Sequence, residues 1–582
     1  MNNEKKNAAE ESVAKVVGMI KAKIQNELPE AEYPNPVTTT CKIPLKCGAV
    51  LDCALYLPQK EGAFPTVIIR NPYYGDGTNS AFFGTFSEHG YAAIFVSVRG
   101  TLDSTGDWLP FEHEMEDGVE VIDWVASQPW CDGNVATYGG SYLGHTQWSV
   151  ASCGHPALKT CFISVYGPFG YDLFYRRGMF RQNIWTIWAA KMMGENRRRA
   201  DFTPEFLQKS LSFRPQTKLG EELISETCEW YNMWNGNTKR DDAYWADGFW
   251  GEFQTVPSKI KIPVMLQGGW FDIFIRPQMK GWRELPEETR AKSRFVIGPW
   301  DHGDAFTESF FGKPMYPDGD ILGSFQFKAA IEWFDYQIKG KPYPHELGVM
   351  ETYSIHDNQW LRWNDDIKAS GTKEFYLDAK ALSLLAKVPD SPASVSYTYD
   401  PKDPVTSIAE SSADALLAVP GLKENKIHQR KPGDRDDVIS FISEPLAEDM
   451  KITGSIQAEI YVSSSAIATA FMVSIMELCE DGESDMIRSD IADIRSLDEN
   501  CWEDYTPGKI VKLNFNTIDV TWCVKKNSRL RVDISSSSFP EYHVHPNKTE
   551  CWAELTDSIT AKQTVYSGAQ HQSKILIPVL EG

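Results

Sequence analysis

The stretch Thr137-Tyr138-Gly139-Gly140-Ser141-Tyr142-Leu143-Gly144 puts a serine between two regular segments. Residues 134–138 before it predict a strand, and residues 146–151 after it predict a helix. An exposed serine on such a turn is a nucleophile elbow, where small neighbours relieve crowding of a strained backbone. The usual G-x-S-x-G spacing is not met, because Leu143 holds the last position and Gly144 comes one residue later. The surrounding sequence must therefore decide whether Ser141 is a nucleophile.

Composition indicates a globular protein of two or three domains, with 582 residues, 42% hydrophobic and 24% charged. The net charge of −22 argues against nucleic-acid and membrane partners, which attract clustered Lys and Arg. No apolar run reaches the roughly 18–20 residues that span a bilayer, and the charged first residues lack a signal-peptide core. The eleven cysteines form no C-x-x-C pair, which is typical of reduced thiols. We therefore expect a cytoplasmic protein.

Strands and helices alternate around the elbow. The helix that these spacings predict covers residues 115–127, and the apolar segments that read as buried strands are 64–70, 92–98, 134–138, 160–165, 262–267 and 293–297. Such alternation predicts an α/β fold with a doubly wound parallel sheet. We assign residues 38–170 and 256–348 to this domain.

The sheet domain is interrupted by residues 171–255, which we expect to form a helical cap. This insertion carries six of the nineteen tryptophans, among them Trp185 and Trp188. These aromatic side chains either pack the core of the insertion or wall a pocket over the carboxyl ends of the strands, where such folds bind ligands. Trp185 and Trp188 are our candidates for the pocket.

The two ends of the chain differ from the middle. Residues 8–28 have apolar side chains at helical spacing, so we assign 1–37 to an N-terminal helical extension. Past residue 348 the helical pattern largely disappears, and segments 373–377, 454–462 and 529–534 alternate like half-buried strands. Residues 349–582 are thus predicted to form a β-sandwich or jelly-roll domain.

A serine nucleophile needs a histidine base and an acid that orients this base. Asp272 follows the predicted strand 262–267, and His302 follows the strand 293–297. The order Ser, Asp, His is the one that an α/β-hydrolase sheet requires. Asp301 is the rival acid, but side chains adjacent in an extended segment point apart, so it ranks second.

The tetrahedral intermediate of such a reaction needs hydrogen-bond donors for its oxyanion. The backbone N–H of Tyr142, which directly follows the serine, is the first candidate. The loop after strand 64–70 supplies the second, because the hydroxyl group of Tyr73 could reach over the active site.

Several ordered segments together resemble the bacterial cocaine-esterase-like hydrolases, which are similar to X-prolyl dipeptidyl peptidases and α-amino acid ester hydrolases. These segments are 98–106, 128–135, 141–144, Arg70-Asn71-Pro72-Tyr73, Gly269-Trp270-Phe271-Asp272 and Gly298-Pro299-Trp300-Asp301-His302. The resemblance implies an α/β-hydrolase core, an inserted helical cap and a C-terminal jelly roll. It also implies catalysis by Ser141, Asp272 and His302, with Tyr73 in the oxyanion hole, and it explains the displaced glycine.

The chain departs from the amino acid ester hydrolases at positions that hold a substrate ammonium group in that family. Two carboxylates of those enzymes lie just after the catalytic aspartate, where this chain has the apolar Phe274 and Ile275. The region that would supply a third carboxylate carries Arg176 and Arg177 instead. We assign Phe274 and Ile275 to the substrate pocket. The two arginines are interpreted as solvated, with a carboxylate-binding role as the alternative.

These features predict a serine hydrolase that cleaves small carboxylic esters, or amides, of a neutral acyl group through an acyl-enzyme. Neither a metal nor an organic cofactor is implied, and His543 and His545 lack a nearby third ligand in the sequence. Similar proteins are often dimers or larger, so a homo-oligomer is expected. The alternatives are an X-prolyl dipeptidyl aminopeptidase and a binding module on an inert hydrolase scaffold.

Overall fold

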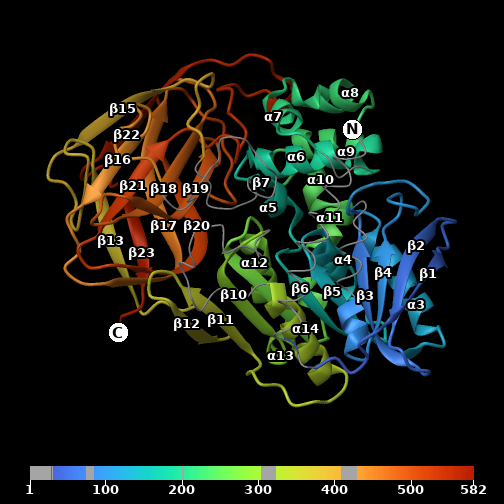
Figure 1. The fold of residues 1–582 in the computed structure, drawn as a ribbon. Coiled ribbons are helices and arrows are strands. Elements are labelled where there is room, and N and C mark those ends of the chain that lie inside the picture. The colour runs from blue at the N-terminus through green and yellow to red at the C-terminus, as the bar shows by residue number, and fades with distance from the viewer. Residues whose placement is uncertain are drawn as a thin grey trace, which may run out of the picture.

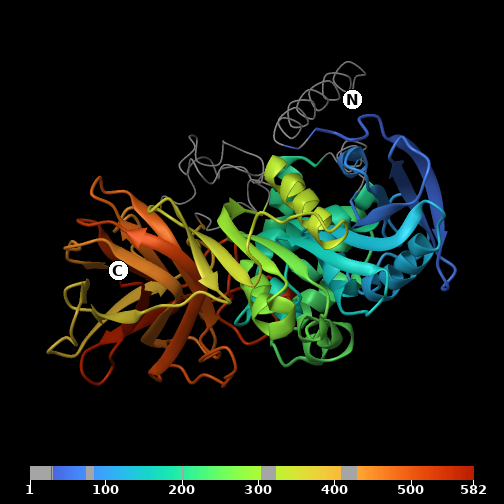
Figure 2. The same cartoon turned by 90° about the horizontal axis from the view of Figure 1, so that it is seen from below.

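The computed structural model describes residues 28, 30–73, 84–198, 202–302, 323–407 and 429–581. In Figure 1 the helix-covered sheet domain lies at the right, a mostly helical segment at the top and a β domain at the left, and Figure 2 shows the β domain beside the sheet domain from below. The predicted N-terminal helix over 8–28 lies almost wholly outside the described residues.

In the described part of the chain, ten strands form the first sheet in the order β1-β2-β4-β3-β5-β6-β9-β10-β11-β12. Neighbours from β4 to β11 pair in parallel, while β1, β2 and β12 add antiparallel edges. The strands are β1 (Val37–Pro44), β2 (Val50–Leu57), β3 (Phe64–Asn71), β4 (Ala92–Ser97), β5 (Cys131–Gly140), β6 (Leu158–Ser164), β9 (Val264–Phe271), β10 (Arg294–Asp301), β11 (Val349–Ser354) and β12 (Gln359–Asn364). The predicted parallel sheet is confirmed.

Helices cover both faces of this sheet. On one face, α3 (Glu114–Ala126) and α4 (Tyr142–Ala151) bury Val121, Ile122 and Trp148 in the same core as Ile68 and Ile94. On the other face, α14 (Gly323–Gln337) contributes to a second core, which contains Trp333, Phe334, Val67 and Ile69. Because both faces are covered, every residue of β4, β9 and β10 is buried.

The insertion between β6 and β9 is mainly helical, as the sequence predicts. In addition it contains a two-stranded hairpin of β7 (Tyr175–Arg176) and β8 (Met179–Phe180). Its helices are α5 (Gly170–Phe174), α6 (Gln182–Met192), α7 (Pro204–Ser212), α8 (Leu219–Ile224), α9 (Glu229–Gly236), α10 (Ala243–Ala246) and α11 (Gly248–Phe253). After them, α12 (Ile275–Glu284) follows β9, and α13 (Glu287–Arg290) leads to β10.

Eleven strands in the described residues make up the second sheet, which contains the predicted strands near 373–377, 454–462 and 529–534. They are β13 (Gly371–Asp378), β14 (Ser383–Leu385), β15 (Ala393–Tyr399), β16 (Ile439–Ser443), β17 (Met450–Ser464), β18 (Ala470–Leu478), β19 (Ser484–Asp493), β20 (Val511–Val524), β21 (Arg529–Ser535), β22 (Ala561–Ser567) and β23 (Lys574–Val579).

The expected domain boundary at residue 349 does not coincide with the boundary between the two sheets. Strand β11 begins there but pairs in parallel with β10, and β12 continues the first sheet to Asn364. Alternating exposure on the edge strand β12 gives it the same sequence pattern as the strands of the second sheet. The second sheet therefore begins after Asn364, with β13.

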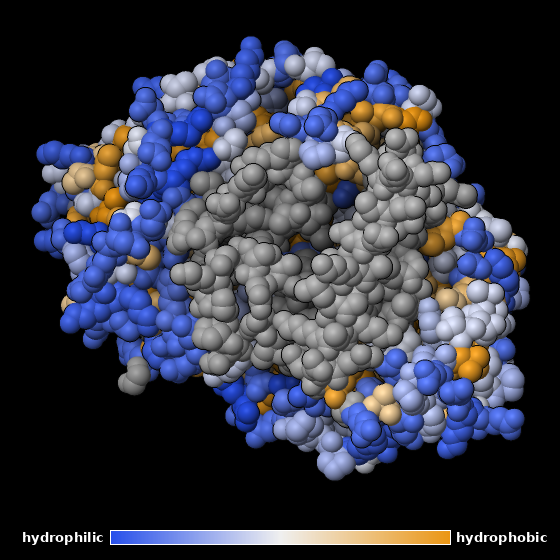
Figure 3. Space-filling view, viewed as in Figure 1, coloured by the Kyte–Doolittle hydropathy of each residue, from blue (hydrophilic) through white to orange (hydrophobic). Residues whose placement is uncertain are grey.

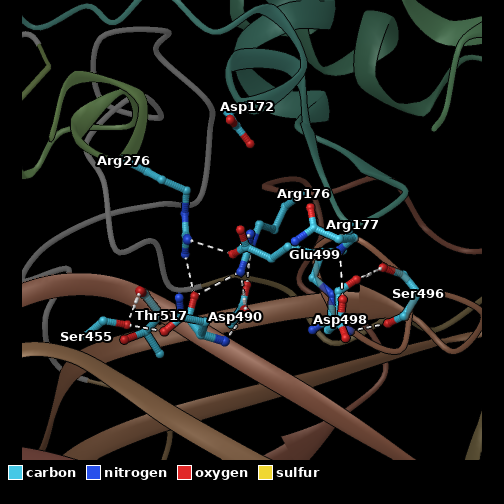
Figure 4. A network of polar contacts seen from close by, with 12 residues as sticks. Asp172, Arg176, Arg177, Arg276, Ser455, Asp490, Ser496, Asp498, Glu499 and Thr517 are labelled. Carbon is cyan, nitrogen blue, oxygen red and sulfur yellow. Dashed lines mark hydrogen bonds and ion pairs between the residues drawn. The ribbon is translucent and has the colours of Figure 1, made fainter. Parts of the chain in front are cut away.

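The cap and the β domain meet through buried charges. Arg176 of β7 binds Asp490 of β19 through two guanidinium nitrogens, at 2.5 and 2.7 Å, and reaches Glu499 at 2.8 Å (Figure 4). Arg276 of α12 also contacts Glu499 at 3.3 Å. Arg177 donates to backbone oxygens of Ser496 and Asn514. Both expectations for Arg176 and Arg177 are wrong, because tertiary contacts between these domains bury the two side chains.

A further ion-paired cluster joins the first sheet to the β domain. His356, in the turn between β11 and β12, lies 2.9 Å from a Glu477 carboxylate oxygen and 3.3 Å from one of Asp485. Burial lowers the pKa of His356, but the contacts with Asp485 and Glu477 outweigh this and raise it to about 9. The unfolded chain has an imidazole pKa of about 6.5. The resulting stabilisation is therefore complete below about pH 6.5 and is lost as the pH rises through about 9.

We expect His356→Gln to lower the Tm at pH 6 and to lower it much less at pH 10. Differential scanning calorimetry at both pH values measures this difference. His571→Gln is the control, because the ring of His571 packs against Tyr461 and Tyr566. Equal losses of Tm at the two pH values for His356→Gln would contradict a charged His356.

Candidate active site

Ser141 sits on a strained turn between β5 and α4. Its backbone has φ 57° and ψ −126°, a conformation that non-glycine residues rarely adopt. The carbonyl oxygen of Ser141 accepts hydrogen bonds from the N–H groups of Gly144 and His145, which start the helix. The turn thus has the geometry of a nucleophile elbow at the carboxyl edge of the sheet.

The structure explains the unusual position of the second glycine. A Cβ atom on Gly144 would lie 2.9 Å from Cβ of Tyr166 and 3.0 Å from the Ser164 carbonyl oxygen, so no side chain fits there. The side chain of Leu143 instead lies over Gly139, where a Cβ atom would come within 2.5 Å of it. The close approach of α4 to β6 therefore requires glycine at 144 and not at 143.

The three predicted catalytic side chains converge at this turn. His302 Nε2 lies 2.9 Å from Ser141 Oγ, and Nδ1 lies 2.6 Å from Asp272 Oδ2. An ionised carboxylate only accepts hydrogen bonds, so Nδ1 carries the proton and Nε2 is free to accept one from Ser141. Asp272 is 2% exposed, and its other oxygen accepts the N–H of Phe274 at 2.7 Å.

Asp272 is thus the carboxylate that contacts His302, as the chain order predicts. The rival Asp301 is buried at the end of β10, beside His302 in sequence. His302 Nδ1 contacts Asp272, so Asp301 is not the acid that orients this ring.

The two predicted oxyanion donors flank Ser141. Trp188 of the cap donates its indole N–H to the Tyr73 hydroxyl oxygen at 3.3 Å, and this hydroxyl also hydrogen-bonds with Ser141. Burial raises the pKa of Tyr73, and these two hydrogen bonds partly offset the rise, so the group is a neutral O–H donor. Tyr142 is the first residue of α4, so its N–H has no partner within the helix.

The side chain of Tyr142 is held in place by a buried ion pair that was not predicted from the sequence. Its hydroxyl accepts the N–H of Phe111 and donates to Glu114, each at 2.9 Å. Glu114 pairs with Arg70 of β3, the strand that leads to Tyr73. Burial raises the pKa of Glu114, and Arg70 partly offsets this. One buried cluster therefore supports the backbone at both oxyanion donors.

A cavity of about 250 Å³, measured with part of its mouth, adjoins Ser141. Its described lining is aromatic or aliphatic apart from the hydroxyl groups, and consists of Tyr73, Phe111, Ser141, Tyr142, Tyr166, Ile184, Trp185, Trp188 and Phe274. The predicted pocket residues Trp185, Trp188 and Phe274 are all present. Phe111, Tyr166 and Ile184 were not predicted.

Ile275 does not line this cavity, so its assignment to the pocket is wrong. It is the first residue of α12, and its side chain lies where a Cβ atom of Gly268 would meet it at 2.7 Å. The start of the helix turns Ile275 toward β9, while Phe274 just before it remains in the cavity wall.

A larger hollow of about 610 Å³ lies in the β domain, between residues such as Arg430, Met472 and Arg531. Its described lining contains none of Ser141, Asp272 and His302. On the face in Figure 3, hydrophilic residues dominate the coloured surface and apolar residues occur in small groups. Neither feature competes with the cavity at Ser141 as a site for acyl transfer.

We expect Tyr73→Phe to lower kcat for p-nitrophenyl butyrate by roughly 10²–10³-fold, as loss of an oxyanion donor does. Trp188→Phe should lower kcat less, because it removes only the group that orients the Tyr73 hydroxyl. Steady-state kinetics measure both effects, with Tyr138→Phe, a buried tyrosine of the opposite core, as control. An unchanged kcat in Tyr73→Phe would remove Tyr73 from the oxyanion hole.

Comparison with known proteins agrees with this geometry. Residues 48–304 match the family model of the X-Pro dipeptidyl-peptidases of family S15, and residues 352–576 match the C-terminal non-catalytic domain of these enzymes. The two matched segments follow one another and together cover most of the chain. The family resemblance that the sequence indicates is confirmed.

A curated relative and two solved structures align with nearly the whole chain. Cocaine esterase of Rhodococcus sp. (strain MB1 Bresler) is 25% identical, over 94% of this chain and 99% of its own. An aminopeptidase of a marine sediment Thaumarchaeota archaeon has a TM-score of 0.81 at 21% identity, covering 95% and 98%. An α-amino acid ester hydrolase has a TM-score of 0.78 at 21% identity, with the same coverage. The chain is thus a hydrolase of the serine esterase and S15 peptidase group, with an α/β-hydrolase fold.

The described residues contain neither a candidate membrane span nor a candidate metal site. Within these ranges, no helix is long and apolar enough to cross a membrane. No cluster of three metal-ligating side chains occurs among them. His543 and His545 instead contact the N–H of Phe180 and the carboxylate of Asp493.

Proposed function

We propose that this protein hydrolyses small, uncharged carboxylic esters through an acyl-enzyme on Ser141. The observation that carries the proposal is the cavity beside Ser141, whose described walls hold aromatic and aliphatic side chains but no carboxylate. Walls of this kind suit an uncharged acyl group better than a charged one.

In the proposed reaction, Ser141 Oγ attacks the ester carbonyl carbon while His302 Nε2 accepts its proton. The Tyr73 hydroxyl and the Tyr142 N–H bind the oxyanion that forms. His302, held by Asp272, then gives the proton to the leaving alcohol oxygen as the C–O bond breaks. Water, deprotonated by His302, then attacks the acyl-enzyme. His302 returns this proton to Ser141 Oγ as the bond between Oγ and the acyl carbon breaks, which releases the acid and free Ser141.

An aminopeptidase activity is the second candidate, because the S15 model and the archaeal structure are both named for peptidases. A peptide ammonium group needs an anionic partner, since an unpaired buried cation is costly. The acids in the interface near α12 already have partners: Asp490 and Glu499 bind arginines, and Asp172 binds Arg240. This arrangement favours a neutral acyl substrate.

A matched panel tests the proposal with wild type and Ser141→Ala. It contains p-nitrophenyl acetate, butyrate and benzoate, together with phenylglycine methyl ester and Ala-Pro-p-nitroanilide. We expect serine-dependent turnover of butyrate and benzoate and little turnover of the two amine substrates. Preferential turnover of Ala-Pro-p-nitroanilide would replace the esterase by the peptidase, and no reaction with a fluorophosphonate would indicate an inert scaffold.

A further inference from the structure

Tyr166 lies at the carboxyl edge of the sheet, two residues after β6, and its side chain lines the same cavity as Ser141. The residue is 1% exposed. Its carbonyl oxygen accepts the indole N–H of Trp148 at 3.0 Å, and its ring packs edge-on against His145 and Phe274. Backbone and ring are thus both fixed.

The hydroxyl group of Tyr166 has no hydrogen-bond partner among the residues that the structure describes. Most buried polar side-chain atoms have such a partner, so this exception requires an explanation. Burial raises the pKa of this hydroxyl well above its ordinary value, which makes the group a neutral O–H donor.

The other polar groups of the cavity wall already have partners in the protein. Trp185 donates to the Leu173 carbonyl oxygen at 2.7 Å, and Trp188 donates to Tyr73. The Tyr142 hydroxyl binds Glu114, and Ser141 binds His302. Besides the two oxyanion donors, the described lining therefore offers a ligand the hydroxyl group of Tyr166, which has no partner among the described residues.

We infer that the Tyr166 hydroxyl donates a hydrogen bond to an acceptor atom of the substrate's acyl group, and that this group is a small, uncharged aromatic ring carrying that acceptor. Phe274 and Trp185, whose ring centroids lie 5.7 Å apart, supply the aromatic wall for this ring. The inference deepens the proposed ester hydrolysis and rests on it. A site built to hydrogen-bond a substrate discriminates strongly against the analogue that lacks the acceptor.

The test compares p-nitrophenyl benzoate with the three p-nitrophenyl pyridinecarboxylates, which replace one ring CH by a nitrogen acceptor at the 2-, 3- or 4-position. For each ester, kcat/KM of wild type is divided by that of Tyr166→Phe, which cancels the intrinsic reactivity of the ester. We expect this ratio to be about tenfold or more for at least one pyridine isomer and within about twofold of unity for benzoate.

Tyr166→Phe keeps the ring that packs on His145 and Phe274, and an unchanged Tm checks its fold. Tyr138→Phe is the matched control and should leave all four ratios near unity. Equal ratios for benzoate and the three isomers would overturn the inference, whether activity falls uniformly or not at all.

The Ser141→Ala variant separates this failure from failure of the proposed function. Serine-dependent benzoate hydrolysis with equal ratios would contradict the role of Tyr166 alone. Benzoate hydrolysis that persists in Ser141→Ala, or wild type that cleaves none of the four esters, would contradict both.

Discussion

Replacing Ser141 with alanine is expected to lower kcat for p-nitrophenyl butyrate by roughly 10⁴–10⁶-fold, with little change in KM. The loss follows because Ser141 is the hydroxyl that contacts His302 at the end of the cavity, and its removal leaves water as the attacking group. Steady-state assays of purified protein, with a matched thermal melt, measure the effect.

Ser149→Ala is the matched control for this variant. Ser149 lies on the same helix α4, is buried, and donates its hydroxyl to the His145 carbonyl oxygen at 2.9 Å. Its loss should leave kcat within a few-fold of wild type. Activity retained in Ser141→Ala would mean that another group performs the attack.

Asp272→Asn is expected to lower kcat by roughly 10⁴-fold while leaving the fold intact. An amide can donate to His302 Nδ1 and thereby stabilise the tautomer whose Nε2 carries the proton, which cannot accept the serine proton. Buried Asp272 also stabilises the imidazolium that forms during attack.

Asp301→Asn provides the comparison, because Asp301 is the other acid beside His302 in sequence and is also buried. We expect a loss of kcat at least 100-fold smaller than that of Asp272→Asn, in line with the contact of His302 with Asp272. A larger loss of kcat in Asp301→Asn than in Asp272→Asn would show that Asp301, and not Asp272, orients His302.

The sequence predicted the sheet and the convergence of Ser141, Asp272 and His302 because these depend on local patterns. Short apolar strands mark the parallel sheet, and the carboxyl ends of neighbouring parallel strands meet at one edge. Trp185 and Trp188 were predicted as pocket residues from the aromatic content of the cap, and Phe274 from the family resemblance.

What the sequence could not predict depends on contacts between distant segments. Nothing in the local sequence distinguishes the buried Arg176 from an exposed arginine, because its partner Asp490 is distant in the chain. Ile275 and Phe274 are adjacent and equally apolar. Their side chains point in different directions because α12 begins at Ile275. One feature of the sequence could have indicated Tyr166 as a pocket residue, namely its position just after a predicted strand of the sheet.

Peptide mapping after reaction with a fluorophosphonate shows which residue attacks the substrate. We expect one phosphonyl group per chain, attached to Ser141, with loss of ester hydrolysis in proportion to labelling. Label on a different residue, or full ester hydrolysis by protein whose Ser141 is labelled, would contradict attack by Ser141.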